Sequence, residues 1–274
     1  MFPNHRSIAL LLAVIAASGT AVSAEEFRPE TTAAFDHYVA LSEQRMSQEE
    51  NSGPFLWIDR LPQAQRDADY KRLKAGEVIT ERLQTLDHGI PVPVPHGLIH
   101  HWIGTAFIPG ATLARTLAFL QDYDHQYNFY APDVQGSKLV QRDGDHFKVF
   151  LRLQKKKIIT VILNTDYDVT YTVLGPDRAI SDSRSTRIAE VENPGRVDES
   201  EKPVGNDSGF LWRLNSYWRF LQKDGGVYVE LEAISLTRDI PTGLNWLVGP
   251  FVTSIPQESL VFTLTRTRDA IAGK

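Results

Sequence analysis

The clearest pattern in the chain is an alternation of apolar and polar residues on both sides of Asp224-Gly225. The segment before this pair carries apolar residues at even positions, namely Phe210, Trp212, Leu214, Trp218 and Phe220. The segment after it carries them at odd positions, namely Val227, Val229, Leu231 and Ala233. Because successive side chains of a strand point to opposite faces, a hairpin turning at Asp224-Gly225 places both rows on one side of a sheet. The same register sets Arg219 beside Glu230, so we interpret Glu230 and Glu232 as cross-strand charge pairs on the outer face rather than as a catalytic pair.

The remaining elements follow from the same kind of pattern. Runs rich in β-branched and aromatic residues predict strands over residues 98–108, 134–142, 145–154, 157–174, 178–192, 209–222 and 226–238. Apolar residues at helical spacing predict helices over residues 30–50, 62–74, 111–125 and 255–272. A run of antiparallel strands followed by one long helix predicts an α+β protein, in which a curved antiparallel sheet wraps around the C-terminal helix.

The first 24 residues have the layout of a signal peptide. His5-Arg6 precedes an unbroken apolar run at 8–17, and small residues follow at 22–24 before Glu25. Ten apolar residues are too few to span a bilayer stably, since a transmembrane helix needs about 20. The alternative is an uncleaved N-terminal anchor. We expect an exported protein, periplasmic or secreted, with no stable membrane span after cleavage.

The rest of the chain divides into two parts. Residues 25–96 are expected to form a helical and proline-rich extension, in which 78–86 is either a strand or a further turn of helix. The prolines at 91, 93 and 95 force their predecessors into extended conformations, so we interpret 90–95 as a linker. Residues 97–274 then form the main domain.

Composition excludes several functional classes. The chain has no cysteine, which excludes disulfide scaffolds, thiol catalysis and cysteine-bound metals. Its formal net charge is −5, and this argues against nucleic acid as a partner because phosphate binding needs a clustered basic surface. No phosphate-binding loop, nucleophile elbow or dinucleotide-binding glycine pattern is present. We therefore expect neither a cofactor nor a metal.

Several segments resemble the START-like (SRPBCC) superfamily, which has the helix-grip fold and includes polyketide cyclases and coenzyme Q-binding proteins. The resemblance is carried by LAFLQDYDHQYNFY at 117–130, APDV at 131–134, GVYVELEAISLTR at 226–238 and IPQESL at 255–260. HHWIG at 100–104 with FIPG at 107–110 is similar to a bacterial branch of exported members. The resemblance covers about residues 97–272. It implies an enclosed space between sheet and C-terminal helix, in proteins that range from lipid carriers to cyclases.

Aromatic residues are the best candidates for such a pocket. Eight of them fall in elements that would line or gate the space: Trp102, Tyr127, Tyr130, Tyr171, Trp212, Trp218, Trp246 and Phe251. For any one residue ordinary core packing is the competing interpretation. As a set they indicate an apolar pocket with a few polar groups, which is typical of small-molecule sites. The main hypothesis is a non-catalytic protein that binds a hydrophobic small molecule or lipid.

Two residues are candidates for catalysis under an alternative hypothesis. A cyclase- or aromatase-type enzyme would use His100 or Arg187 as its acid–base group, provided that the side chain points into the cavity. His100 and His101 cannot readily share a metal, because neighbours in a strand point to opposite faces. A third hypothesis is a cavity-free interaction module that docks through its N-terminal helices.

The export hypothesis predicts a defined N-terminus. Expression of the full chain in a Gram-negative host should yield a protein that begins at Glu25, because the small residues at 22–24 suit signal peptidase. The intact mass of the purified protein measures this directly. A protein that retains its first 24 residues would contradict cleavage and favour the uncleaved anchor.

Overall fold

The hairpin at Asp224-Gly225 forms the centre of the fold. The computed structural model describes residues 28–157, 159–239 and 245–273. Strand β10 (Arg213–Lys223) pairs with β11 (Gly226–Arg238), and Arg219 lies opposite Glu230 as predicted. The turn residues Asp224 and Gly225 have φ angles of 58° and 75°. Both fall in the left-handed region that a two-residue type I′ turn requires, which favours glycine at the second position.

The hairpin belongs to an antiparallel sheet of nine strands. Its order is β1-β4-β11-β10-β8-β7-β6-β5, with β9 paired to β8. The other strands are β1 (Ile79–Arg82), β4 (Gly97–Pro109), β5 (Val134–Asp143), β6 (His146–Lys156), β7 (Thr160–Val173), β8 (Arg178–Glu192) and β9 (Ser200–Glu201). A separate hairpin joins β2 (Leu86–Asp87) to β3 (Ile90–Pro91), so part of the expected proline-rich linker pairs as strands. Every long strand matches a predicted one within a few residues.

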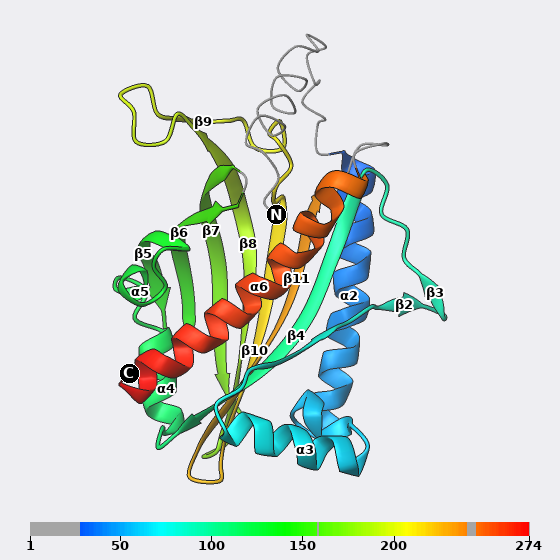
Figure 1. The fold of residues 1–274 in the computed structure, drawn as a ribbon, viewed down its shortest axis with the longest axis vertical. Coiled ribbons are helices and arrows are strands. Elements are labelled where there is room, and N and C mark those ends of the chain that lie inside the picture. Colours follow the sequence, from blue (N-terminus) through cyan, green and yellow to red (C-terminus); the bar gives the residue numbers. More distant parts are fainter. Residues whose placement is uncertain (1–27, 158, 240–244, 274) are drawn as a thin grey trace, which may run out of the picture.

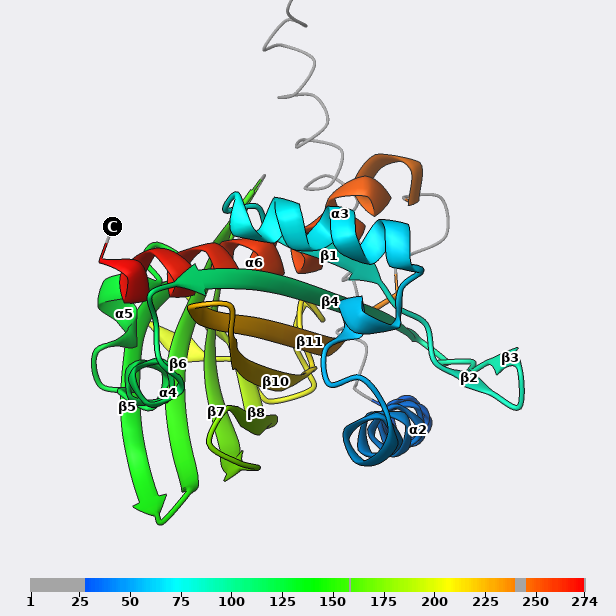
Figure 2. The same ribbon diagram turned by 90° about the horizontal axis from the view of Figure 1, so that it is seen from below.

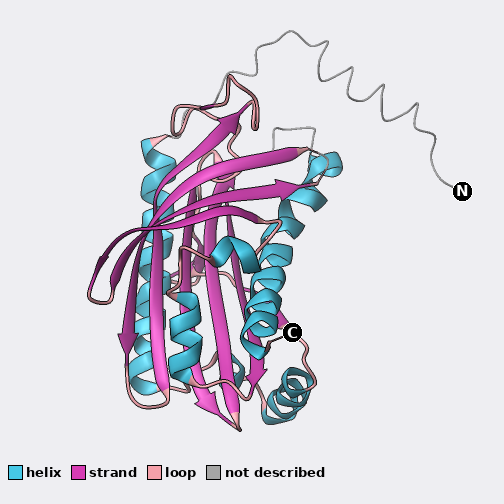
Figure 3. Ribbon diagram, turned by 90° about the vertical axis from the view of Figure 1, so that its left-hand side faces the viewer, coloured by secondary structure: helices cyan, strands magenta, loops and turns pink. Residues whose placement is uncertain are grey.

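Helices cover both faces of this curved sheet (Figure 3). They are α2 (Pro29–Ser52), the short 3₁₀ helix η1 (Trp57–Arg60), α3 (Gln63–Lys74), α4 (Leu113–Leu120), α5 (Gln126–Phe129) and α6 (Asn245–Ala272). The predicted helix over 111–125 is shorter than expected, and α6 begins before the predicted position 255. The sheet wraps around α6, which crosses its concave face (Figures 1 and 2). The predicted α+β helix-grip architecture is confirmed.

Helix α6 packs against the sheet at Gly104 of β4. A Cβ atom at this position would lie only 2.8 Å from Leu264 Cδ1 and 3.1 Å from Leu260 Cδ2. Contacts below 3.0 Å are essentially never seen for real Cβ atoms, so a side chain at residue 104 would force at least Leu264 to shift. Leu260 and Leu264 are buried there. Glycine at position 104 therefore lets these two leucines pack directly on the backbone of β4.

Helix α2 covers the opposite, convex face. Its residues Phe35, Tyr38, Val39 and Met46 form a buried cluster with four residues of the sheet region, Trp212, Tyr217, Ile234 and Leu236. The segment before residue 97 also supplies β1, which pairs with β4 at the edge of the sheet. As a result, β11 is buried on both faces, whereas the alternation of its residues had suggested one wet face.

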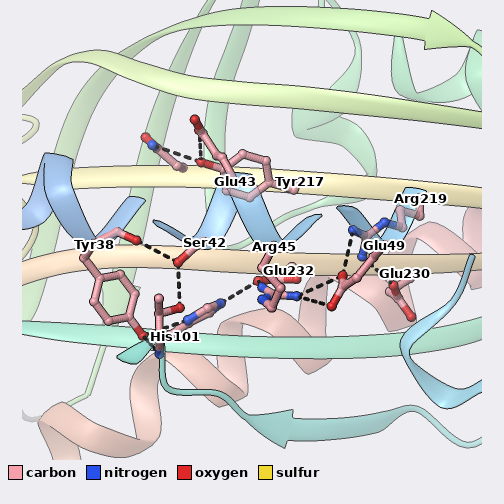
Figure 4. A network of polar contacts seen from close by, with 12 residues as sticks. Tyr38, Ser42, Glu43, Arg45, Glu49, His101, Tyr217, Arg219, Glu230 and Glu232 are labelled. Atoms are coloured by element: carbon pink, nitrogen blue, oxygen red, sulfur yellow. Dashed lines mark hydrogen bonds and ion pairs between the residues drawn. The ribbon is translucent and has the colours of Figure 1, made fainter. Parts of the chain in front are cut away.

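Beneath α2 lies a network of buried charges (Figure 4). Glu230 and Glu232 are each 1% exposed, and Arg219 is 4% exposed. Arg219 donates to Glu230 over 3.2 Å and to Glu49 of α2 over 3.3 Å. The predicted charge pairing is thus confirmed, but the pair is buried because α2 covers it.

Glu232 forms the second part of this network. It accepts a hydrogen bond of 2.6 Å from His101 Nε2 and contacts Arg45 of α2. His101 Nδ1 lies 2.9 Å from the Tyr38 hydroxyl, also on α2. Burial by itself would raise the pKa of Glu232, but the His101 hydrogen bond and the Arg45 charge lower it. Helix α2 is therefore fastened by compensated charges as well as by apolar contacts.

This arrangement predicts a large cost for breaking one pair. Arg219→Met leaves Glu230 buried without its main cation, so we expect the free energy of unfolding to fall by about 3 kcal/mol. Chemical denaturation followed by circular dichroism measures the change. The matched control is Arg196→Met, which breaks an exposed pair with Asp198 and should cost less than about 0.5 kcal/mol. Equal effects of the two substitutions would contradict a special role for the buried network.

Candidate functional site

A large cavity lies between the concave face of the sheet and α6. Its volume is about 1140 Å³, and it extends over β6, β7, β8, β10 and β11. It lies between α6, which packs closely against β4, and the strands beyond β4, some of whose inward residues are small. Three serines and an alanine occupy the centre of the concave face: Ser181, Ser183, Ser216 and Ala233. Larger side chains at these positions would fill the space.

Five of the residues singled out in the sequence line this cavity. They are His100, Trp102, Tyr130, Tyr171 and Trp218. Trp102 and His100 come from β4, Tyr171 from β7 and Trp218 from β10, so period-two alternation brings them to the same face. The side chains of Trp246 and Phe251 lie outside the described residues.

Two predicted pocket residues lie elsewhere. Tyr127 is 41% exposed, because α5 is a single turn that directs the preceding Gln126 inward and Tyr127 to the surface. Trp212 is buried, but in the cluster beneath α2, where its Nε1 donates to Asp207 over 3.0 Å. It precedes the first residue of β10, so the alternation that places Leu214 and Trp218 inward does not extend to it.

His100 is a buried, neutral histidine at the wall of the cavity. It is 3% exposed, and its Nε2 lies 3.0 Å from the Thr237 hydroxyl. Burial lowers the pKa of His100 to about 4, and the charge of Arg82 adds to this effect. At neutral pH the imidazole can accept or donate a hydrogen bond but carries no charge.

Arg187 does not face the cavity. It lies on the convex side next to a register shift between β7 and β8, where it contacts Asp166 at 3.4 Å and also pairs with Glu201. The shift changes which residues of β8 point inward, and simple alternation could not have shown it. This placement excludes the form of the enzyme hypothesis in which Arg187 acts in the pocket.

Two tyrosines that the sequence did not indicate, Tyr123 and Tyr167, line the cavity together with Tyr130 and Tyr171. The Tyr123 and Tyr171 hydroxyls lie 2.9 Å apart, and the Tyr130 hydroxyl lies 2.7 Å from that of Thr267 in α6. Tyr167 lies two positions beyond Val169 on the same face as Tyr171. Burial raises the pKa of Tyr167 and of Tyr171 to about 12, so both stay neutral donors. Because every second residue of a strand lies on the same face, the prediction of Tyr171 as a pocket residue could also have identified Tyr167.

Charged residues are confined to one end of the cavity, where β6, β8 and β11 end. Exposed Ile159 and Phe210 lie at this end, which we take as the mouth. Three lysines there form ion pairs: Lys155 with Asp133 at 2.7 Å, Lys157 with Glu258 at 2.5 Å, and Lys202 with Glu190 at 2.6 Å. The interior is therefore lined by apolar and uncharged polar groups behind a charged rim.

Within residues 28–157, 159–239 and 245–273, no three His, Asp or Glu side chains come together as metal ligands would. His125 instead pairs with Asp122 at the surface. None of the helices in these ranges has both the length and the apolar character that crossing a membrane requires.

Comparisons with known proteins find similarity only among solved structures. No protein-family model and no curated protein matches the chain. A STAR-related lipid transfer protein from Xanthomonas axonopodis is 17% identical, with a TM-score of 0.45, over 69% of this chain and 98% of that one. The Zhui aromatase/cyclase from Streptomyces is 11% identical, with a TM-score of 0.43, over 64% and 94%. The lipid transfer and protein localization domain of human StarD13 is 9% identical, with a TM-score of 0.42, over 77% and 98%.

The environment of His100 predicts a pH-dependent stability. Because its folded pKa is about 4, below the ordinary 6.5, the unfolded chain binds more protons between these values. The contribution of His100 is therefore complete above pH 6.5 and is lost as the pH falls toward 4. Between pH 7 and pH 5 we expect the free energy of unfolding of the wild type to fall by about 2 kcal/mol more than that of His100→Gln.

Denaturant titrations at the two pH values measure this difference. His146→Gln is the control, since His146 is an exposed histidine on β6. This control should follow the wild type. If His100→Gln also follows the wild type, then His100 is not a buried neutral histidine in solution.

Proposed function

We propose that the chain is an exported protein that binds a hydrophobic small molecule or lipid between its sheet and α6. The observation that carries this proposal is the cavity of about 1140 Å³, lined by aromatic and aliphatic side chains. Small-molecule sites are commonly about 300–1,000 Å³, so this space suits a ligand at or above the usual upper size. Burial of apolar ligand surface would supply the affinity, at about 25 cal/mol per Å² removed from water.

The two other functional hypotheses have less support. A cavity-free interaction module would have its sheet–helix gap filled by side chains, and the gap is hollow. A cyclase-type enzyme would need His100 together with a second reacting group, and the hydrogen-bond partner of His100 is a threonine hydroxyl. Ligand binding without a reaction therefore accounts for more of the site.

The export part of the proposal rests on the N-terminal sequence. The apolar run at 8–17 and the small residues at 22–24 lie outside the described residues, so only their sequence pattern supports export. A chain without cysteine outside the cytoplasm would depend on its packed clusters and on the charge network beneath α2 for stability.

Filling the cavity should abolish binding. Ala233 of β11 lies on the concave face, opposite Trp102 of the neighbouring strand β4. The substitution Ala233→Trp therefore places an indole in the ligand space. We expect the affinity for a neutral apolar fluorophore, N-phenyl-1-naphthylamine, to fall at least tenfold. Organic extracts of the purified wild type, analysed by mass spectrometry, should also contain apolar molecules that the variant lacks.

Lys148→Trp serves as the control for this experiment. Lys148 is exposed on the outer face of β6, so an indole there adds the same aromatic group without entering the cavity. Its fluorophore affinity should stay within twofold of the wild type. A clean extract, together with no binding of the fluorophore by the wild type, would refute the proposed function.

A further inference from the structure

One row of small residues crosses the concave face beneath the cavity. Ser216 of β10 lies opposite Ser183 of β8 on one side and opposite Ala233 of β11 on the other. All three line the cavity and are partly exposed, although they lie in central strands of the sheet. Ala233 is the clearest case, because the residues on either side of it in β11 are buried. The three residues therefore form the floor of a depression in the cavity wall.

An indole forms one side of this depression. Trp218 is the next inward residue after Ser216 along β10, and it also lines the cavity. On its other side along the strand lies Phe220, whose ring is stacked on the indole with an interplanar angle of 8° and 5.9 Å between the ring centroids. Phe220 is fully buried, whereas Trp218 is partly exposed. Phe220 thus covers one face of the indole, and the exposed part of Trp218 lies on the side of Ser216.

Along β10 the depression is long enough to hold one stacked ring. Leu214 is the next inward residue beyond Ser216, and it lines the cavity on the far side. A strand rises about 3.3 Å per residue, so the Cα atoms of Leu214 and Trp218 are about 13 Å apart. Stacked aromatic rings have their centroids about 4.5–7 Å apart, and a ring at that distance from the indole lies above Ser216. A larger side chain at position 216 would occupy this space itself.

We propose that the open face of Trp218 is a stacking platform for a planar aromatic ring of the ligand, which occupies the space above Ser216. This inference rests on the proposed function and specifies its ligand class. A ring and an alkyl chain gain similar free energy per unit of buried apolar area, but only the ring gains the additional attraction between aromatic faces. A rigid ring also loses less conformational entropy on binding than a flexible chain of equal size.

Two matched alcohols test the inference. The aromatic alcohol 2-(2-naphthyl)ethanol and the saturated alcohol 2-(decahydro-2-naphthyl)ethanol share one carbon skeleton and one hydroxyl group, but only the first is planar. Their affinities for delipidated protein are measured by displacement of N-phenyl-1-naphthylamine, whose own dissociation constant is determined for every variant. After correction for partitioning from water into hydrocarbon, the aromatic alcohol should bind the wild type about fivefold more tightly, which is the scale of one aromatic contact.

The possible failures of this experiment are distinguishable. Equal corrected affinities, or a preference for the saturated alcohol, would overturn the inference and leave cavity binding intact. If neither the fluorophore nor either alcohol binds, both the inference and the proposed function fail.

Substitutions at the platform separate stacking from burial. Trp218→Leu removes the indole but keeps an apolar side chain, so the corrected affinities of the two alcohols should then agree within twofold. Ser216→Leu leaves the indole in place and covers its open face, so it should abolish the preference as well. Circular dichroism identifies which variants are folded. If either folded variant keeps the wild-type preference, the ring does not bind against Trp218 and the inference is overturned.

Phe262→Leu is the matched control. Phe262 of α6 also lines the cavity, but the Arg266 guanidinium lies over its ring, 5.3 Å from the centroid. The substitution removes one cavity aromatic and leaves Trp218 and Ser216 unchanged, so the fivefold preference should persist. Equal loss of the preference in Phe262→Leu and Trp218→Leu would contradict a specific platform at Trp218.

Discussion

The close contact between α6 and β4 is the constraint on which the cavity depends. Leu260 and Leu264 reach the backbone of β4 because Gly104 has no side chain. The helix is thereby held against one side of the curved sheet, while the strands farther from β4 curve away beneath it (Figure 2). The intervening space is lined in part by small inward residues, Ser181 and Ser183 of β8, Ser216 of β10 and Ala233 of β11. A bulkier residue at 104 would displace Leu264 from its contact with β4.

Because the concave face is hollow, packing on the convex face must contribute more of the stability of the fold. A void forfeits the dispersion contacts that a packed core would supply. Here the convex face is covered by α2 and the segment that follows it, and β11 is buried on both faces as a result. The charges beneath α2 are costly to desolvate, but each buried carboxylate has a cation or a hydrogen-bond donor within reach. The N-terminal segment is thus part of the folded unit that supports the cavity.

The buried polar groups of the two faces of the sheet differ in charge. On the convex face the buried ions are paired across three elements, and this fastens one helix to the sheet (Figure 4). On the concave face the interior groups are neutral hydroxyls, among which Tyr123 pairs with Tyr171 and Tyr130 with Thr267.

The sequence by itself determined the elements, their order and the register of the central hairpin, because periodicity and turn chemistry are local properties. It also indicated Trp102, Tyr171 and Trp218 as cavity residues, since they follow the alternation of regular strands. Only the tertiary structure decided what depends on contacts between distant segments. The burial of Glu230 required α2, the outward position of Arg187 required a register shift beside β7, and Trp212 faces α2 because β10 begins after it. The hollow itself arises from the distance between α6 and strands far from it in the sequence, and no local pattern encodes that distance.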